Sequence, residues 1–308
     1  MRPLHLFSLI ALGAMWGASF MFIKVTLEEM TPLAVAWVRL GGGGVVMLLV
    51  VVAMRLRAPL IAQYWRDVTV LAVIGTALPY VLIAWGQQQI PSNIGAVLNG
   101  AMPFWVVILS TIFLPAERLT PLRAMGVVMG FAGVAIIIGP DALDLGSATT
   151  QGQFAFLAAT SSYAAGAVYI RRRMLKANPW VLATAQNWMA FALLTPVILG
   201  AGEVPDVSAL SGRVILAAVG LAVLAQGIGI LIYYWLISNV EATQASFVTY
   251  LAPIAAQFWG WLVLAEVPGL VLIPGLALVF GGMILLNRRP RSPLPVADAS
   301  PPVSHGTP

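Results

Sequence analysis

Polar side chains that could bind a small molecule recur at helical spacing inside long apolar segments of this sequence. In one segment Ser246, Thr249 and Gln257 are separated by three and eight residues, so they lie on one face of a helix. Hydroxyl and amide groups on such a face can hydrogen-bond a polar ligand. The face carries no histidine, thiol or carboxylate for acid–base or nucleophilic chemistry, so the pattern predicts binding and no catalytic residues.

Similar faces occur in several other apolar segments, and we predict that they converge on one cavity with aromatic, hydroxyl and amide walls. The predicted ligand-binding residues are Trp16, Arg39, Thr76, Tyr80, Asn99, Tyr163, Gln226, Tyr234, Thr249, Tyr250 and Gln257. An alternative is that these groups only join neighbouring helices, by packing or by hydrogen bonds worth about 0.6 kcal/mol each in a membrane.

Two prolines lie on the same polar faces, at Pro103 and Pro253. Each removes a backbone donor from the middle of its segment, which bends a helix and leaves carbonyl groups free. We predict that both positions act as gates, and a packing kink without gating is the alternative.

Arg39 is the one arginine well inside an apolar segment, about two helical turns from the outer end. Its guanidinium can pair with a ligand carboxylate. It can also extend to the membrane interface or hold a neighbouring helix.

The remaining ionisable residues exclude several kinds of chemistry. The carboxylates lie in loops or at segment ends, so no proton relay is visible and we expect a uniporter. Cysteine is absent, and the two histidines, His5 and His305, lie near the chain ends. We therefore expect no metal, no cofactor and no enzyme activity.

The composition explains where these faces must be located. Of the 308 residues 60% are hydrophobic and 9% charged, and the mean hydropathy is +0.93. A soluble domain is about 45–50% apolar and about 25% charged. Soluble enzymes, disordered proteins and coiled coils are excluded, and the chain is predicted to be an all-α integral membrane protein.

Runs of about 20 apolar residues predict membrane-spanning helices. Ten such runs are present, at 4–24, 33–54, 68–88, 94–114, 120–139, 151–171, 181–200, 213–237, 243–265 and 271–287. The first run is too long for the apolar core of a signal peptide, so we predict that it is retained.

The basic residues predict the orientation. With the N-terminus inside, thirteen of the 16 lysines and arginines fall on the cytoplasmic side, and only Lys24 and Arg213 on the other. Both termini are thus predicted to be cytoplasmic. The excess of basic residues on the cytoplasmic side explains the pI near 9.9, so the high pI does not indicate a nucleic-acid partner.

The sequence also repeats itself at a nearly constant offset. A shift of 150 aligns Trp85 with Trp235 and Pro103 with Pro253. Shifts of 149 and 147 align further pairs, including Glu117 with Glu266, Gly126 with Gly275, Gly133 with Gly282, Pro32 with Pro179 and Arg39 with Gln186. Five helices per copy is an odd number, so the second copy must be inverted. Inverted repeats are typical of secondary transporters that bind solute near the midplane.

The motifs that carry a family resemblance are Trp16-Gly17-Ala18-Ser19-Phe20, Pro32 followed by Arg39, and Glu117-Arg118-Leu119-Thr120 followed by Gly126 and Gly133. With these, the chain resembles the EamA-type branch of the drug/metabolite transporter superfamily, and it is most similar to bacterial aromatic amino-acid exporters. The resemblance implies a bacterial inner-membrane protein with ten helices. It also implies a cavity lined by the third, fourth, eighth and ninth helices.

We therefore expect two inverted five-helix repeats, at 1–140 and 141–288, and a disordered cytoplasmic tail at 289–308. The expected function is export of aromatic and other hydrophobic amino acids by alternating access. The alternatives are a broad drug/metabolite efflux carrier and, with no ring of charge or filter motif, a channel. The predicted partners are the small-molecule substrate and the lipid bilayer. The sequence predicts no particular protein partner.

Overall fold

A computed structural model describes residues 3–56, 63–114, 117–139, 144–174, 177–240 and 242–287. Within these ranges the chain forms helices joined by short turns, and no β-strand. In chain order the helices are α1 (Pro3–Thr26), α2 (Pro32–Ala53), α4 (Trp65–Ala72), η1 (Val73–Ala77), α5 (Leu78–Gln89), α6 (Ser92–Asn99), α7 (Met102–Phe113), α8 (Pro121–Ile138), α9 (Ala148–Arg173), α10 (Pro179–Ala201), α11 (Gly212–Val219), η3 (Gly220–Ile228), α12 (Gly229–Asn239), α13 (Ala242–Ala245), α14 (Val248–Leu264) and α15 (Leu272–Asn287), where η marks a π-helical stretch.

Within the described residues, seven helical segments are long and apolar enough to cross a membrane. Three of them combine shorter elements: α4 with η1 and α5, α6 with α7, and α11 with η3 and α12. The apolar helices α14 and α15 are shorter, with 17 and 16 residues. The 26-residue α9 falls outside both groups, because threonine, glutamine and serine interrupt it and three arginines end it. The ten-span count therefore stays a prediction.

Proline marks the start of several helices, as the sequence suggested. Thr31 is the N-cap of α2, and its hydroxyl accepts from the N–H of Ala34, while Pro32 takes the first helical position. Asn178 caps α10 in the same way, with Pro179 following it. Proline suits this position because the first N–H of a helix has no intrahelical acceptor.

Glycines bring two pairs of helices into close contact. In the α1–α14 pair, a β-carbon added at Gly17 would lie 2.7 Å from the carbonyl oxygen of Ala252. In the α8–α15 pair, Gly126 faces the backbone of Gly282 and Gly133 faces that of Gly275. The earlier glycine of α8 meets the later glycine of α15, and the later meets the earlier, so α8 and α15 are antiparallel. Small residues are the usual means of such close approach between membrane helices.

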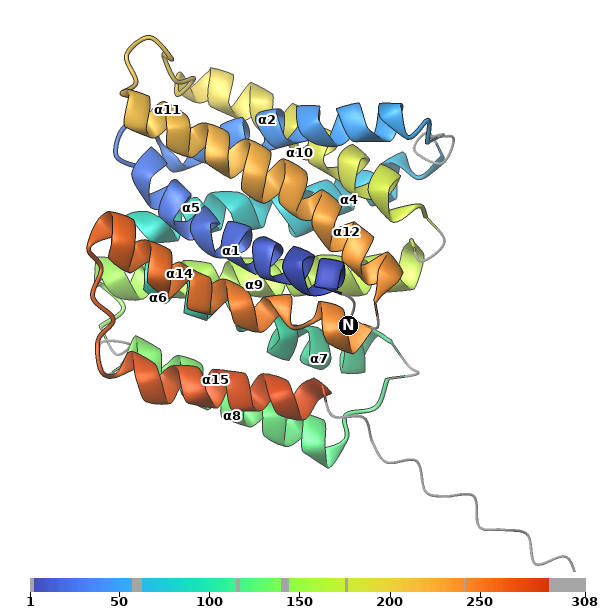
Figure 1. Cartoon of the computed structure of the whole chain (residues 1–308), viewed down its shortest axis with the longest axis vertical. Helices are drawn as coiled ribbons and strands as arrows, with labels where there is room; N and C mark the ends of the chain where they lie inside the picture. Colours follow the sequence, from blue (N-terminus) through green and yellow to red (C-terminus); the bar gives the residue numbers. More distant parts are fainter. Residues whose placement is uncertain are drawn as a thin grey trace, which may run out of the picture.

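The helices are stacked as elongated rods. α8 and α15 form one edge of the stack, α2, α10 and α11 lie toward the opposite edge, and α1, α9 and α14 lie between them (Figure 1). Large apolar side chains point outward from the rods, including Leu216, Val128 and Ile273, which are 73%, 69% and 65% exposed. Such a surface is unusual in water and fits contact with lipid.

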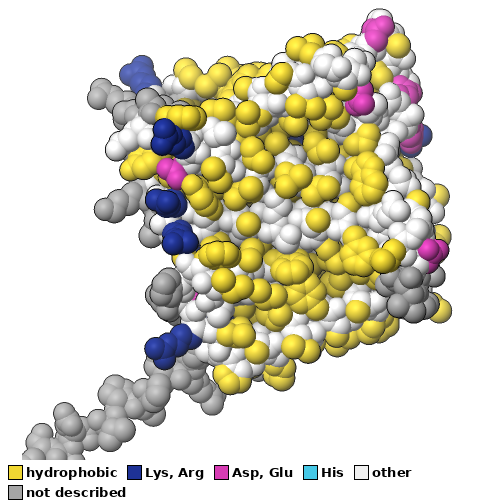
Figure 2. All heavy atoms as spheres, turned by 180° about the vertical axis from the view of Figure 1, so that it is seen from behind, with side chains coloured by type: hydrophobic (Ala, Val, Ile, Leu, Met, Phe, Trp, Pro, Cys, Tyr) yellow, Lys and Arg dark blue, Asp and Glu magenta, His cyan; other side chains and the backbone are white. Residues whose placement is uncertain are grey.

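Charged side chains gather at the two ends of the rods. Figure 2 shows the lysines and arginines mostly at one end and the acidic residues mostly at the other, with an apolar surface between them. The start of α1 and the end of α15 both lie at the basic end (Figures 1 and 2). This separation is what the positive-inside rule predicts. The predicted tail, 289–308, lies outside the described residues.

Candidate functional site

The interior of the bundle contains a hydrogen-bonded network among α2, α5, α10 and η3. Gln226 of η3 is the central residue of this network, which we call the central network. The Gln226 side chain is 3% exposed. Its Oε1 accepts from Arg39 Nε at 3.1 Å and from the Tyr80 hydroxyl at 2.6 Å. Its Nε2 donates to Asn187 Oδ1 at 2.8 Å, and Asn187 Nδ2 donates to the carbonyl oxygen of Leu40 at 2.7 Å. The network therefore joins α2, α5, α10 and η3.

Two glycines of α2 make space for this network. A β-carbon at Gly43 would lie 2.3 Å from Gln226 Cγ, and one at Gly44 would lie 2.8 Å from Asn187 Nδ2. Both distances are too short for real atoms, so larger residues here would displace the two amides. α2 continues through these positions as one α-helix. Gly43 and Gly44 therefore serve close packing within a continuous helix.

Arg39 is held on two sides. Its Cζ lies 4.0 Å from the centroid of the Tyr80 ring, a cation–π contact, and Gln226 binds its Nε. Among the described residues the ion pairs are Arg171–Glu117 and Arg213–Glu28, so Arg39 has no carboxylate partner there. It lies seven residues after the start of α2, a rise of about 10 Å. The side chain is partly exposed.

Aromatic residues flank the network. Tyr163 of α9 makes an edge contact with Tyr80, with ring centroids 6.1 Å apart. Trp16 of α1 donates from Nε1 to the carbonyl oxygen of Ala225, next to Gln226, and its ring lies 5.2 Å from that of Tyr233. Tyr234 of α12 contacts Tyr233 and Trp180, with centroids 5.8 and 6.1 Å away. Trp16, Tyr163 and Tyr234 are partly exposed.

Gln186, the residue before Asn187, makes a second set of polar contacts. Gln186 Nε2 donates to the hydroxyl of Thr76 at 2.6 Å and to the carbonyl oxygen of Leu71 at 3.2 Å. Sequence reasoning treated Gln186 only as the counterpart of Arg39 and missed Asn187. The available signal was two consecutive amides inside an apolar segment, where unpaired polar groups are costly.

The predicted residues of α14 do not join the central network. The hydroxyl of Thr249 donates to the carbonyl oxygen of Ser246, in the turn before α14, at 2.6 Å. The Tyr250 hydroxyl accepts from Asn287 of α15 at 2.9 Å, so this ring faces α15. Gln257 Nε2 donates to the carbonyl oxygen of Asn93 in α6 at 3.0 Å. A role for these side chains in binding substrate stays a prediction.

Asn99 and the two prolines mark irregular positions. α6 ends at Asn99, whose buried Oδ1 accepts no hydrogen bond from the described residues. After a turn, α7 begins at Met102 with Pro103 as its second residue. Pro253 is buried inside α14, which remains helical around it. The helix is thus interrupted beside Pro103 only, and gating at either proline stays a prediction.

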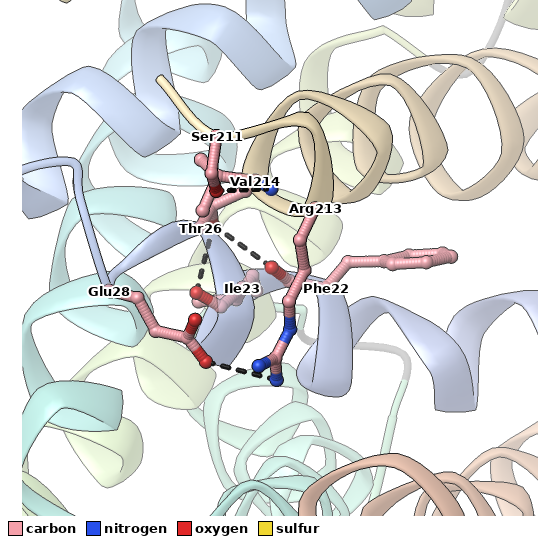
Figure 3. A network of polar contacts seen from close by, with 7 residues as sticks. All are labelled: Phe22, Ile23, Thr26, Glu28, Ser211, Arg213 and Val214. Carbon is pink, nitrogen blue, oxygen red and sulfur yellow. Dashed lines mark hydrogen bonds and ion pairs between the residues drawn. The ribbon is translucent and has the colours of Figure 1, made fainter. Parts of the chain in front are cut away.

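Polar contacts connect the loop after α1 to the start of α11, at the acidic end of the bundle. Figure 3 shows the ion pair between Glu28 and Arg213, at 3.1 Å, and the hydroxyl of Thr26 turned toward two carbonyls of α1. Glu29 accepts from the backbone N–H of Ser211 at 2.7 Å. That hydrogen bond holds the pKa of the Glu29 carboxyl below its ordinary value.

Glu266 complements the start of a helix that is distant from it in sequence. Its carboxylate accepts from the N–H of Ser92 at 2.8 Å and from that of Asn93 at 3.1 Å, so it caps α6 rather than the next helix along the chain. It also borders a pocket of about 280 Å³ between the α5–α6 turn, α8 and the α14–α15 loop. Glu117 instead pairs with Arg171 of α9.

Long apolar helices around a hydrogen-bonded polar network define a multi-pass membrane protein. The comparisons with known proteins agree. The chain belongs to the EamA-like transporter family, whose model matches residues 4–139 and again residues 150–288.

Relatives of similar length occur in Bacillus subtilis and Escherichia coli. The uncharacterized transporter YoaV of Bacillus subtilis is 23% identical over 283 residues, covering 90% of this chain and 94% of its own. The uncharacterized inner membrane transporter YedA of Escherichia coli K12 is 26% identical over 309 residues, covering 95% and 96%. A crystal structure with 20% identity superposes with a TM-score of 0.64 over 92% of this chain and 96% of that one, which shows the shared fold.

Proposed function

We propose that this EamA-family membrane protein exports aromatic and other hydrophobic amino acids by alternating access. The observation that carries the proposal is the network of Arg39, Tyr80, Asn187 and Gln226. Two of these residues come from the first stretch matched by the family model and two from the second. A solute bound there would be contacted by both stretches at once.

Reciprocal contacts support two inverted repeats. The 149-residue offset maps Gly126 onto Gly275 and Gly133 onto Gly282, and the contacts observed are Gly126 with Gly282 and Gly133 with Gly275. Exchanging the two halves converts one contact into the other. This is the relation that a two-fold axis between the halves produces.

The hydrogen bonds follow the same exchange. The repeat offsets map Arg39 onto Gln186 and Thr76 onto Gln226. Arg39 bonds Gln226, and Gln186 bonds Thr76. The halves therefore make equivalent contacts, which suits a mechanism in which they exchange roles as the site opens first to one side and then to the other.

For orientation we propose that the basic end, with both termini, faces the cytoplasm of a bacterial inner membrane. Reporter fusions test this directly. A fusion at Thr149 should report the outer side, and one after Arg173 the cytoplasmic side. The opposite result at either position would contradict both the orientation and the inverted repeat.

For energetics we propose a uniporter driven by the substrate gradient. The described carboxylates lie in loops or at helix ends, away from the central network. Transport in proteoliposomes should then persist without an imposed proton gradient. Strict dependence on a pH gradient, lost on neutralising Glu117 or Glu266, would contradict this.

The aromatic side chains around the network support the proposed cargo. Stacking on aromatic rings contributes about 0.5–1.5 kcal/mol per pair, while the amides and hydroxyls can bind the polar backbone groups of an amino acid. Trp16→Ala and Tyr80→Ala should therefore reduce transport of phenylalanine more than that of alanine, without loss of expression.

The matched control is Trp261→Ala, because Trp261 is 56% exposed on the outer surface of α14 and should affect neither cargo. If the Trp16 and Tyr80 variants lost transport of phenylalanine and alanine equally, these residues would have only a packing role. Saturation and counterflow by unlabelled phenylalanine would distinguish a carrier from a channel. No amino-acid transport by the unaltered protein would refute the cargo.

A further inference from the structure

We propose that Arg39 recognises a carboxylate group on the transported solute and that Asn187 is the positioning residue that keeps Arg39 ready for it. This inference rests on the proposed transport function and adds a chemical requirement. A cargo needs an apolar body and a carboxylate, and an ammonium group cannot replace the carboxylate.

The first argument is charge. An ionised side chain within the apolar layer is costly unless it is paired or faces water. Arg39 lies about 10 Å along α2, and the described carboxylates sit at helix ends and in loops. The aromatic face of Tyr80 and the neutral amide of Gln226 stabilise the guanidinium without neutralising it. An anionic solute would supply the missing charge.

The second argument is geometry. Tyr80 covers the guanidinium at 4.0 Å, and Gln226 occupies its Nε. Neither terminal Nη group donates to a described residue, and the side chain is partly exposed. Two donors on one planar group suit the two oxygens of a carboxylate, which arginine binds in a bidentate manner.

The third argument concerns the orientation of Gln226. A side-chain amide can present either its oxygen or its nitrogen. Asn187 Oδ1 accepts from Gln226 Nε2, which turns Gln226 Oε1 toward Arg39 and Tyr80. Asn187 is itself fixed by donating to the backbone of Leu40, one residue from Arg39. It acts through Gln226 and does not touch Arg39.

A structural role for Arg39, as a tie between α2 and η3, predicts a different outcome. Loss of a structural contact between helices lowers the affinity for every ligand to the same extent. Loss of a recognition group lowers the affinity only for ligands that carry the recognised group. The relevant readout is therefore a ratio of affinities rather than activity alone.

The test uses three ligands that share a phenyl ring: L-phenylalanine, 3-phenylpropionate, which lacks the ammonium group, and phenethylamine, which lacks the carboxylate. Binding to the purified full-length protein in detergent is measured by thermal shift and by calorimetry. Phenylalanine and phenylpropionate should bind, and phenethylamine should bind about tenfold to a hundredfold more weakly, as expected for losing a hydrogen-bonded charge pair.

Variants then locate the effect. Arg39→Gln should lower the affinity for both carboxylate ligands to that for phenethylamine and leave the affinity for phenethylamine unchanged. Arg39→Lys keeps the charge but lacks the pair of Nη donors, so it should give intermediate affinities. This variant also provides the test if Arg39→Gln folds poorly. Asn187→Leu should lower the preference for carboxylates and spare phenethylamine. The control Arg213→Gln removes an exposed arginine at the end of the bundle and should change nothing.

Equal binding of phenethylamine and phenylalanine by the unaltered protein would overturn the inference, and so would equal loss of all three ligands in both Arg39 variants. An unchanged preference in Asn187→Leu would remove the positioning role. If phenylpropionate binds through Arg39 but no amino acid is transported, the proposed cargo fails and this inference stands. If phenylalanine is transported but its binding is independent of Arg39, this inference fails and the proposed cargo stands.

Discussion

Replacing Gly43 with alanine tests whether the central network is held as tightly as its geometry indicates. The added β-carbon would lie 2.3 Å from Gln226 Cγ, 2.7 Å from Gln226 Cβ and 3.0 Å from the carbonyl oxygen of Ala222. Carbon atoms pack at about 3.5–4.0 Å, so Gln226 must move by about 1 Å or more. A shift of that size breaks the hydrogen bonds that its Oε1 accepts from Arg39 and Tyr80.

The magnitude follows from three contributions. Overpacking costs about 1–3 kcal/mol, two lost hydrogen bonds cost about 1 kcal/mol each, and alanine gains about 1 kcal/mol over glycine in a helix. The net expectation is a destabilisation of about 2–4 kcal/mol, measured by chemical unfolding in mixed micelles. Affinity for phenylalanine should fall in the same variant.

The control for Gly43→Ala is Gly200→Ala in α10, where a β-carbon would meet nothing within 4 Å. That variant should be as stable as the unaltered protein, or up to about 1 kcal/mol more stable. If Gly43→Ala matched this control in stability and in affinity for phenylalanine, Gln226 would not be held between α2 and its partners as described.

Further predictions concern the outer loops and the glycine contacts. Glu28→Gln should lower stability by at most about 1 kcal/mol, and less at high salt, because its partner Arg213 is exposed. For Glu29, accepting a backbone N–H depresses the folded pKa below the ordinary 4.5. Its stabilisation is therefore present above that pH and lost as the pH falls through the folded pKa, so Glu29→Gln should be less stable than the parent near pH 7 and equal to it at strongly acidic pH in unfolding titrations. Gly133→Ala should lower the melting temperature more than Gly281→Ala, because a β-carbon at Gly133 meets backbone atoms at 2.6 and 2.8 Å, whereas one at Gly281 meets the flexible end of a methionine.

The helices were largely predictable because apolar length and proline starts depend on local sequence. The predicted span 33–54 corresponds to α2 at Pro32–Ala53, and the span 181–200 to α10 at Pro179–Ala201. Three of the ten predicted spans are missing from the seven that qualify: α14 and α15, which have only 17 and 16 residues, and α9. The polar residues Thr150, Gln153 and Thr160 of α9 are buried among other helices, a property of tertiary packing that hydropathy does not measure.

The candidate site was predictable in part. Arg39, Tyr80 and Gln226 stood out because they are polar within apolar segments, and they do meet. The polar face of α14 was identified correctly as a helical face, but periodicity does not tell which neighbour a face meets, and Tyr250 meets α15. The π-helical stretches η1 and η3 add a further difficulty, because each extra residue turns the following part of the helix by about 100° relative to an ideal one.

The composition of α9 has a consequence for biogenesis. α9 begins the second stretch matched by the family model, yet it packs against η1, α5, α6 and α7 of the first. Because α9 is rich in threonine, glutamine and serine, its transfer from the translocon into lipid is less favourable than that of the strongly apolar helices. Stable insertion of α9 therefore depends on helices synthesised before it, so the order of synthesis itself contributes to correct assembly. A chain beginning at α9 would lack the protein surface that this helix needs in place of lipid.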